Sequence, residues 1–243
     1  MKKLVESSGT GPGTEELLQQ ILKQVRTTRE IPSTALGLRA AAVQDSVEHI
    51  RSDARFAAAQ VHQHNPNALQ HAVPHTPEWP GLIAEFGVHT GRGLTLIATA
   101  FPDETVHGFD SFEGLPEAWT GSREDAGAFD IGGKPPELSV SNTEFHVGWF
   151  DETVPAFART TSQPFRFVHL DADLYSSTKT VFDGLGDRFV PGTVIVFDEY
   201  FGYHGWRQHE HRAFTEFLQS RPDLDFDAVT IGHMNLGVRL REA

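Results

Sequence analysis

Short apolar runs separated by helical patterns occupy the chain from Leu82 onward. The runs that predict strands lie at residues 82–86, 105–109, 144–147, 165–170 and 193–197. Because helical stretches lie between several of them, this alternation predicts a doubly wound α/β fold whose parallel sheet is covered on both faces. Two further strands are predicted at 226–230 and 234–240. Few residues separate these two, so we expect them to pair in antiparallel fashion.

The first 78 residues show helical rather than strand periodicity. Residues 1–13 are rich in Gly, Ser and Thr, and we expect a disordered tail there. Apolar residues recur at helical spacing over 14–29 and again over about 33–64, where Asn65-Pro66-Asn67 ends the pattern. The sequence therefore predicts three parts: a tail (1–13), an N-terminal helical cap (14–78) and an α/β domain (79–243).

Charge and composition exclude several classes of protein. A formal net charge of -13 disfavours general binding to nucleic acid, because phosphate backbones are repelled. No apolar run approaches the roughly 20 residues of a membrane helix, and the N-terminus lacks the apolar core of a signal peptide. The chain has no cysteine, which excludes disulfides, thiolate zinc sites and a cysteine nucleophile. These features favour a cytoplasmic protein.

A glycine-rich turn follows the first predicted strand of the α/β domain. Glu85 is followed by Gly87, Gly91 and Gly93 before a helix begins around Leu94. Glycines allow a tight turn and let a ligand approach main-chain amides, although packing alone can also require such a turn. The spacing differs from the dinucleotide motif G-x-G-x-x-G, which disfavours a dehydrogenase. Glu85 would disfavour a pyrophosphate and suits a cofactor that carries a positive amino group and a sulfonium.

The second predicted strand ends in Asp110, about 20 residues beyond the glycine turn. In open α/β sheets, ligands bind outside the carboxyl ends of the strands. An acid at that place can accept both hydroxyls of a ribose, whereas the alternative is a helix N-cap. The joint spacing of the turn and Asp110 favours the cofactor site.

Acidic residues also follow two later strands. Asp171 ends the strand predicted at 165–170, and Asp198 and Glu199 end the one at 193–197. If these strands are neighbours, three carboxylates converge at one edge of the sheet, which suits Mg²⁺ or a similar hard cation. Without a cation the carboxylates would repel one another, so one would be protonated. The alternative is that these acids cap the helices that follow.

Three segments of this sequence resemble the macrocin-type sugar O-methyltransferases. They are residues 85–93, 108–117 and 169–175, and the resemblance extends from about residue 80 to the end. It implies a class I methyltransferase (Rossmann-like) fold with a seven-stranded mixed sheet, and S-adenosylmethionine as the cofactor. It further implies that Glu85 and the glycine turn hold the methionine end and that Asp110 holds the ribose, with Ser111 beside it.

The resemblance also implies an adenine pocket and a metal site. The pocket would be built after the third strand, by Gly148, Trp149 and Phe150. The family carries metal ligands at Asp171 and at a pair of aspartates after the fifth strand. Here that pair is Asp198-Glu199, and the extra methylene of glutamate changes the reach of the second ligand.

Methyl transfer to a hydroxyl requires that the hydroxyl become nucleophilic. A general base can do this, as can a cation that lowers the pKa of the hydroxyl. Asp171 is the leading candidate for base or metal-bound activator, and we also expect it among the cofactor-binding residues. His204 is a candidate to assist proton removal. Asp173 would steer a sugar hydroxyl, while Tyr200 and Trp206 suit the CH faces of a sugar or a flat aglycone.

We therefore expect an S-adenosylmethionine-dependent, Mg²⁺-assisted O-methyltransferase for a hydroxyl of a sugar or glycosylated secondary metabolite. The segment 119–136, rich in Gly and Pro, predicts a flap over the substrate. The alternatives are a methyltransferase for a phenol, amine or carboxylate, and a non-catalytic S-adenosylmethionine-binding partner. The expected partner is a small-molecule acceptor, with no nucleic acid or membrane, and a homodimer through the N-terminal helices is a further hypothesis.

Overall fold

The computed structural model of the protein describes residues 33–62 and 67–243. The tail expected at 1–13 and the helix expected at 14–29 lie outside the described residues. Residues 39–243 form one compact unit, which includes part of the segment expected to be a helical cap. Within the described ranges, no helix combines the length and the apolar character needed to cross a membrane.

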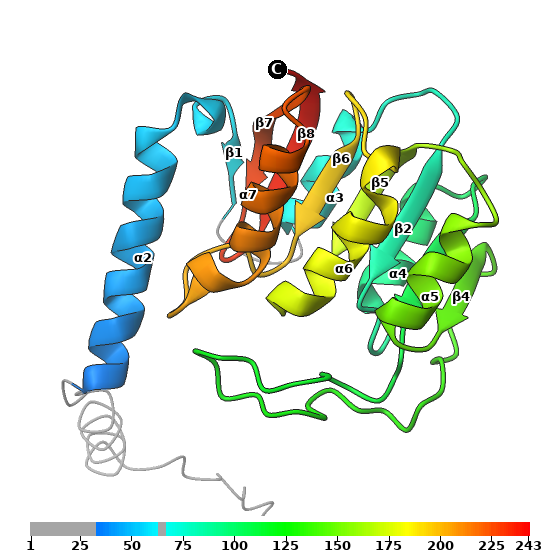
Figure 1. Cartoon of the computed structure of the whole chain (residues 1–243), viewed down its shortest axis with the longest axis horizontal. Coiled ribbons are helices and arrows are strands. Elements are labelled where there is room, and N and C mark those ends of the chain that lie inside the picture. The colour runs from blue at the N-terminus through cyan, green and yellow to red at the C-terminus, as the bar shows by residue number, and fades with distance from the viewer. Residues whose placement is uncertain (1–32, 63–66) are drawn as a thin grey trace, which may run out of the picture. The chain divides into compact units, whose positions relative to one another are not determined.

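An eight-stranded mixed sheet forms the centre of this unit (Figure 1). Its strands lie in the order β1-β7-β8-β6-β5-β2-β3-β4. Their bounds are Gln60–Val61 (β1), Leu82–Phe86 (β2), Val106–Asp110 (β3), Thr143–Val147 (β4), Phe165–Leu170 (β5), Val194–Phe197 (β6), Leu224–Ile231 (β7) and Leu236–Glu242 (β8). β8 is antiparallel to β6 and β7, and the other pairs are parallel.

The seven strands predicted from the sequence correspond to β2 through β8, and the predicted antiparallel pair is β7 with β8. The mixed α/β fold is therefore confirmed, but the count of seven is one too low. The additional strand, β1, has two residues, and both are exposed. It therefore lacks the alternation of apolar and polar positions by which a strand is identified in a sequence.

Two hydrophobic clusters cover the two faces of the sheet. In β2, Leu82, Ala84 and Phe86 belong to one cluster and Ile83 belongs to the other, as the two-residue period of a strand requires. The first cluster contains residues of the helices Phe150–Ala158 (α5), Tyr175–Leu185 (α6) and Glu210–Ser220 (α7). The second contains residues of Asn67–Ala72 (α3) and Arg92–Ala100 (α4). Burial on both faces explains why β2, β5 and β6 are buried along their whole length.

The helix predicted over about 33–64 is shorter than expected. The helix α2 spans Thr34–Ser52, and the chain then turns into a short 3₁₀ helix at Ala54–Phe56 (η1). Asp53 causes this break, because its extended backbone and its carboxylate, which accepts a hydrogen bond from Arg55 N, cap the new turn. The Arg55 guanidinium also bonds Asp225 in β7 and so fixes the break against the sheet.

The loop after β6 holds the later part of α2. Trp206 Nε1 donates to Asp45 Oδ2 at 3.0 Å, and the Arg207 guanidinium forms a two-point ion pair with the same carboxylate. Gly202 N donates to Ser46 Oγ at 2.9 Å. These four hydrogen bonds join Asp45 and Ser46 in α2 to the loop.

His211 in α7 makes the stability of this contact depend on pH. Its ring lies 4.7 Å from that of Trp206 and 5.1 Å from that of His49, as measured between centroids. Burial, together with the nearby His49 and Arg207, lowers the pKa of His211 to about 4. In the unfolded chain the pKa of a histidine is about 6.5. At pH values between about 4 and 6.5 the unfolded chain therefore binds one proton that the folded protein does not bind. Stability is therefore complete above about pH 6.5 and is lost as the pH falls toward 4.

We predict that His211→Gln reduces this acid-induced loss of stability. The free energy of unfolding of the variant, measured by urea denaturation at several pH values between 7 and 5, should fall less steeply than that of the wild type. His233→Gln, at an exposed position, is the matched control and should keep the wild-type slope. Identical slopes for His211→Gln and the wild type would contradict this account.

Candidate active site

A cavity of about 610 Å³ lies at the carboxyl ends of the parallel strands. Its lining comes from the segments after five strands: β2, β3, β4, β5 and β6. Ligands of open α/β sheets bind at this edge, so the cavity lies where the sequence places the site. Among the described residues that line it, seven are acidic and none is Lys or Arg: Asp110, Glu117, Asp151, Glu152, Asp171, Asp173 and Glu199.

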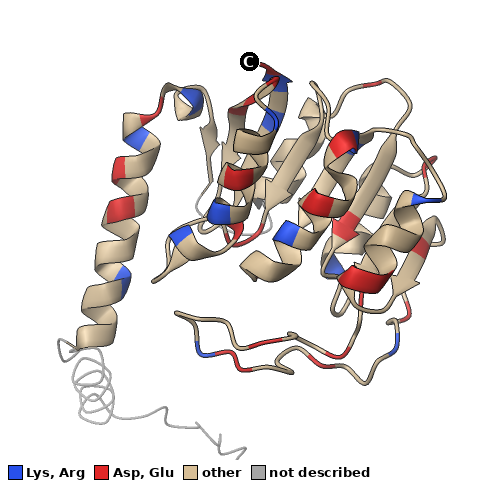
Figure 2. Ribbon diagram, in the orientation of Figure 1, with Lys and Arg blue, Asp and Glu red and all other residues tan. Residues whose placement is uncertain are grey.

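A long loop at residues 111–142 supplies part of this lining. It carries six acidic residues and two basic ones, and Figure 2 shows their spread along the loop. Leu115 and Trp119 in this loop pack with Leu174, which follows β5. The carbonyl of Thr120 lies 2.9 Å from His209 Nε2. The segment expected to be a flap is thus part of a loop that is packed against the domain.

Glu85 lies beneath the glycine turn rather than in the cavity lining. Its side chain is 1% exposed, and Glu85 Oε1 is 2.8 Å from Nδ1 of His169, its partner in β5. Burial raises the pKa of Glu85, although His169 opposes this. A Cβ at Gly93 would lie 2.0 Å from Glu85 Oε1, so the glycine at 93 leaves room for the buried acid. Gly91 and Gly93 lie outside the lining as well.

Gly87 lines the cavity and sets the spacing between two strand ends. Its φ is +91°, and an added Cβ would lie 1.6 Å from the carbonyl oxygen of Asp171. Only glycine adopts this backbone without strain while allowing so close an approach. The end of β2 and the end of β5 can therefore meet at the cavity wall.

Asp110 organises the glycine turn and also lines the cavity. Its Oδ2 accepts hydrogen bonds from the backbone N–H groups of Val88 and His89, each at 2.7 Å. Its Oδ1 accepts one from Phe112 N, also at 2.7 Å. A carboxylate has about four acceptor positions, so three internal bonds leave capacity for a ligand. Ser111 lies next to it in the lining.

The segment after β4 forms the opposite wall. Gly148, Trp149 and Phe150 all line the cavity. The Phe150 ring packs edge-on against Phe86, with centroids 5.7 Å apart. The structure thus brings the segment expected to hold adenine to the same cavity as Gly87 and Asp110.

The three acids expected at a metal site lie together. Carboxylate oxygens of Asp171, Asp198 and Glu199 all lie within 4.8 Å of one another. Burial raises the pKa of Asp171 and of Glu199, and the charge of Asp198 raises both further. Burial would also raise the pKa of Asp198, but His169 and Asn235 hold it below its usual value. Asp198 is therefore the acid of the three that ionises most readily, and a cation would offset the repulsion among them.

Asp173 lies in the cavity lining and is strained. Its φ is +58°, in the left-handed region that side-chain-bearing residues rarely adopt. Burial raises the pKa of Asp173 to about 6, although Glu199 opposes this. His89 and Phe129 also line the cavity with positive φ values. Backbone strain of this kind gathers at functional sites.

The aromatic and histidine residues expected near the substrate lie elsewhere. Tyr200 and Trp206 are buried in the hydrophobic core, 3% and 2% exposed, and neither lines the cavity. The Trp206 ring contacts His49 in α2 and His211 in α7, and the Tyr200 ring contacts His211 and Phe214 in α7. The sequence pattern of this loop does not reveal these contacts. His204 is exposed and also lies outside the cavity lining.

Glu210 is a buried acid of the site that the sequence analysis missed. It is fully buried at the start of α7, and its Oε2 accepts a hydrogen bond from Glu199 N at 3.1 Å. Burial raises the pKa of Glu210, and the charges of Asp173 and Asp198 raise it further. Its one signal in the sequence is an acid in the first turn of a helix, which is common on helix surfaces.

Sequence comparisons place a methyltransferase domain over this site. Residues 84–200 match the family Methyltransf_24, described as a methyltransferase domain. A protein of Streptomyces olivaceus, 8-demethyl-8-(2,3-dimethoxy-alpha-L-rhamnosyl)-tetracenomycin-C 4'-O-methyltransferase, is 29% identical over 145 residues. The match covers 50% of this chain and 53% of the relative, so the chain spans about half the length of that protein. The resemblance to sugar O-methyltransferases that the three segments indicate is confirmed.

Solved structures agree on the fold. The calicheamicin methyltransferase CalS11 matches with a TM-score of 0.59 and 21% identity, over 98% of this chain and 99% of that chain. The O-methyltransferase NovP matches with a TM-score of 0.54 and 21% identity, over 82% and 80%. A second structure of CalS11, named there a TDP-rhamnose 3'-O-methyltransferase, gives a TM-score of 0.50 at 20% identity, over 95% and 96%. The class I methyltransferase fold is therefore confirmed.

The protonation of Glu210 can be tested by substitution. Glu210→Gln copies the shape of the protonated acid and keeps an acceptor for Glu199 N, so at about pH 4 its free energy of unfolding should stay within about 1 kcal/mol of wild type. Because burial raises the pKa of Glu210 above its unfolded value of 4.5, the wild type loses stability as the pH rises above that value, and the variant should gain on the wild type toward neutral pH.

Glu210→Ala is the matched control, since it removes the acceptor and opens a cavity; it should lose about 2–4 kcal/mol. Urea denaturation of the wild type and the two variants measures these differences in the free energy of unfolding. A loss with glutamine as large as that with alanine would mean that the ionised form is required.

Proposed function

We propose that this protein, whose residues 84–200 match a methyltransferase domain, transfers a methyl group from S-adenosylmethionine to a hydroxyl of a sugar or glycoside. One observation carries the proposal. The turn after β2 and Asp110 share a cavity with Asp171 and Glu199, which belong to a cluster of three acids on the neighbouring strands. Methyl transfer to a hydroxyl requires a site for the cofactor and, beside it, a group that activates the hydroxyl. This cavity contains candidate residues for both.

The lining of the cavity fits the cofactor. S-adenosylmethionine carries a positive sulfonium and a positive amino group, and seven acidic residues without Lys or Arg favour such a ligand. Asp110 would accept a ribose hydroxyl with its remaining acceptor position. Trp149 and Phe150 offer apolar surface for the adenine ring. Glu85 acts indirectly, since it supports the turn from below.

The acid cluster fits a hard divalent cation. Asp171, Asp198 and Glu199 would hold Mg²⁺ through oxygen ligands, and its positive charge would offset their repulsion. Bound there, such an ion lowers the pKa of a coordinated hydroxyl and orients it. The residues of this chain present the oxygen atoms and keep them at the edge of the cavity.

Asp171 is our candidate for the group that activates the acceptor. It lines the cavity, and its raised pKa makes it a stronger base than an ordinary aspartate once it is ionised. In the proposed reaction the acceptor oxygen attacks the methyl carbon as the carbon–sulfur bond breaks. Asp171 takes the proton of the acceptor hydroxyl, and S-adenosylhomocysteine is released. Asp173, which is buried at the same wall, would hold a second hydroxyl of the sugar.

The charge of the cavity also favours one class of sugar acceptor. The relatives are named for a rhamnosyl group attached to a tetracenomycin and for TDP-rhamnose, of which only the second carries a diphosphate. A diphosphate would be repelled by the seven acidic lining residues, and the described part of the lining contains no Lys or Arg to bind it. We therefore propose a neutral glycoside as acceptor rather than a nucleotide sugar. Trp119 and Phe129 offer apolar surface for the aglycone.

The role of Asp171 predicts that Asp171→Ala abolishes turnover and preserves cofactor binding. Loss of a general base or metal-bound activator should lower kcat by at least about 10²-fold to 10⁴-fold. The dissociation constant of S-adenosylmethionine, from calorimetric titration, should change little. Asp103→Asn, an exposed aspartate far along the chain from the cluster, is the control for a charge change. Turnover of Asp171→Ala equal to wild type would eliminate this mechanism.

The acceptor and the cation can be tested together. We expect methyl transfer to a neutral rhamnoside of a polyketide aglycone to exceed transfer to TDP-rhamnose and to catechol, as measured by S-adenosylhomocysteine release. EDTA should reduce turnover and Mg²⁺ should restore it, while S-adenosylmethionine binding survives EDTA. Preference for TDP-rhamnose would refute the charge argument, and unchanged turnover in EDTA would refute the cation. Failure of S-adenosylmethionine to bind in either condition would refute the proposed function as a whole.

A further inference from the structure

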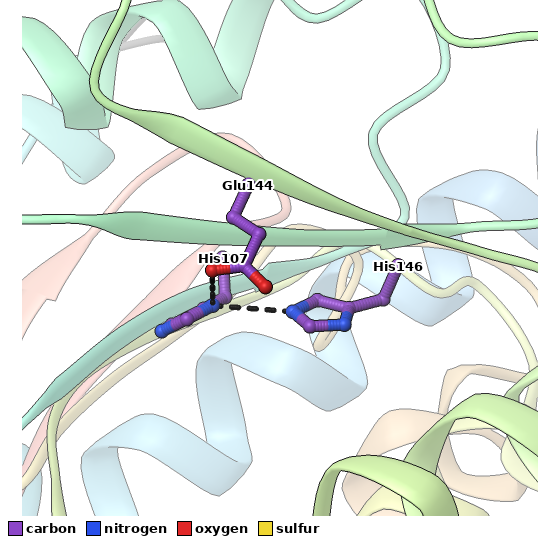
Figure 3. Close-up of side chains that lie close together, drawn as sticks. All are labelled: His107, Glu144 and His146. Atoms are coloured by element: carbon purple, nitrogen blue, oxygen red, sulfur yellow. Dashed lines mark hydrogen bonds and ion pairs between the residues drawn. The ribbon is translucent and has the colours of Figure 1, made fainter. Parts of the chain in front are cut away.

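Two histidines and a glutamate gather on the edge of the sheet, outside the cavity lining. His107 is in β3, and Glu144 and His146 are in β4, the strand at the end of the sheet. Glu144 and His146 are two residues apart, so they share one face of β4, and His107 is the register partner of Glu144. All three side chains therefore extend from the same face of the sheet and point toward one another (Figure 3).

The distances between their ligand atoms match a metal site. His107 Nδ1 lies 3.1 Å from His146 Nε2 and 3.7 Å from Glu144 Oε2. All three ligand atoms lie within 4.8 Å of one another. Bonds of about 2.0–2.1 Å to a tetrahedral Zn²⁺ place neighbouring ligand atoms roughly 3.3–3.4 Å apart. The cluster needs only small side-chain shifts to reach that geometry.

A hydrogen bond between the two imidazoles explains only part of this arrangement. One neutral ring can donate to the other, which accounts for the 3.1 Å distance. At 3.7 Å, Glu144 Oε2 is too far from His107 Nδ1 for a hydrogen bond of its own. A cation between the three atoms gives each of them a partner.

Core packing holds the two imidazoles in place. The Phe157 ring of α5 lies 5.0 Å from each of them, and Phe109 stacks on His146 at 4.3 Å with an interplanar angle of 15°. The His107 side chain is 14% exposed, whereas that of Glu144 is 60% exposed. Two fixed nitrogens and an adjustable carboxylate at the rim leave a side open to water.

We propose that His107, Glu144 and His146 bind a borderline divalent transition metal such as Zn²⁺, with a water as the fourth ligand. Two imidazole nitrogens select such an ion over Mg²⁺, which prefers oxygen ligands and would take the cluster around Asp171. The ion joins the edge strand β4 to β3 across the face that α5 covers. Those two strands end in Asp110 and next to Gly148, so the metal stabilises one wall of the cavity.

Calorimetric titration of ZnCl₂ into the metal-free, full-length protein in excess Mg²⁺ tests this proposal. The wild type should show one high-affinity event. His146→Asn should weaken it by more than about 100-fold, since even changes outside the ligand set cost roughly 10-fold to 100-fold. Glu144→Gln alters an exposed side chain and so preserves folding; it should weaken binding as well.

Two control variants make the result specific. His233→Asn changes an exposed histidine, and Asp171→Ala changes the acid cluster; both should bind Zn²⁺ as the wild type does. Co²⁺ provides a second readout, because four-coordinate Co²⁺ absorbs visible light. This absorption should be weaker in Glu144→Gln and His146→Asn than in the wild type. The proposal would be overturned if the wild type, His146→Asn and Glu144→Gln bound Zn²⁺ with equal affinity. It would also be overturned if Asp171→Ala alone lost the high-affinity binding of Zn²⁺. This test requires no methyl transfer, so it is independent of the proposed function.

Discussion

The close approach of β2 to β5 at their carboxyl ends is the constraint on which the rest of the site depends. Gly87 allows it, because any side chain there would meet the carbonyl of Asp171. Below this point Glu85 and His169 pair across the two strands, and His169 Nε2 lies 3.7 Å from Asp198 on the far side. Burial lowers the pKa of His169, but Asp198 and Glu85 outweigh it and raise that pKa well above its ordinary value. One buried histidine of β5 thus connects an acid of β2 with the acid that follows β6.

The excess of acidic residues near the Glu85–His169 pair determines which ligands the cavity can bind. Asp171, Asp173, Glu199 and Glu210 are all buried enough that their pKa values are raised. Burying several carboxylates together costs free energy unless protons or a cation offset their charge. A positive cofactor and a divalent ion both reduce that cost, whereas a phosphate increases it. The same electrostatic argument therefore supports the cofactor, the cation and the neutral acceptor that we propose.

The two clusters that we propose as metal sites differ in the chemistry of their ligand atoms. The cluster at Asp171 offers only oxygen and lies at the carboxyl edge of the sheet, where the parallel strands β5 and β6 end. The cluster at His107 offers two nitrogens and one oxygen, and it lies on a face of the sheet between two strands. Both arise because neighbouring parallel strands in register bring residues far apart in sequence to within a few ångströms of each other.

Local patterns in the sequence determined the strands, the glycine turn and the acids at the strand ends. Those features repeat with the period of a strand or follow its end, so they can be recognised without knowledge of partners. Asp110 and Asp171 were identifiable for this reason. The two-residue strand β1 and the break at Asp53 lacked such a signal, since exposed residues and a single cap leave no periodic pattern.

Tertiary structure alone decided which side chains meet. Glu210 reaches the acid cluster from the start of α7, and Tyr200 and Trp206 turn into the core because α2 and α7 enclose their loop. His107 and His146 are 39 residues apart and meet only through the register of β3 with β4. Pairing between distant strands depends on the packing of the whole domain, and no single segment of the sequence contains that information.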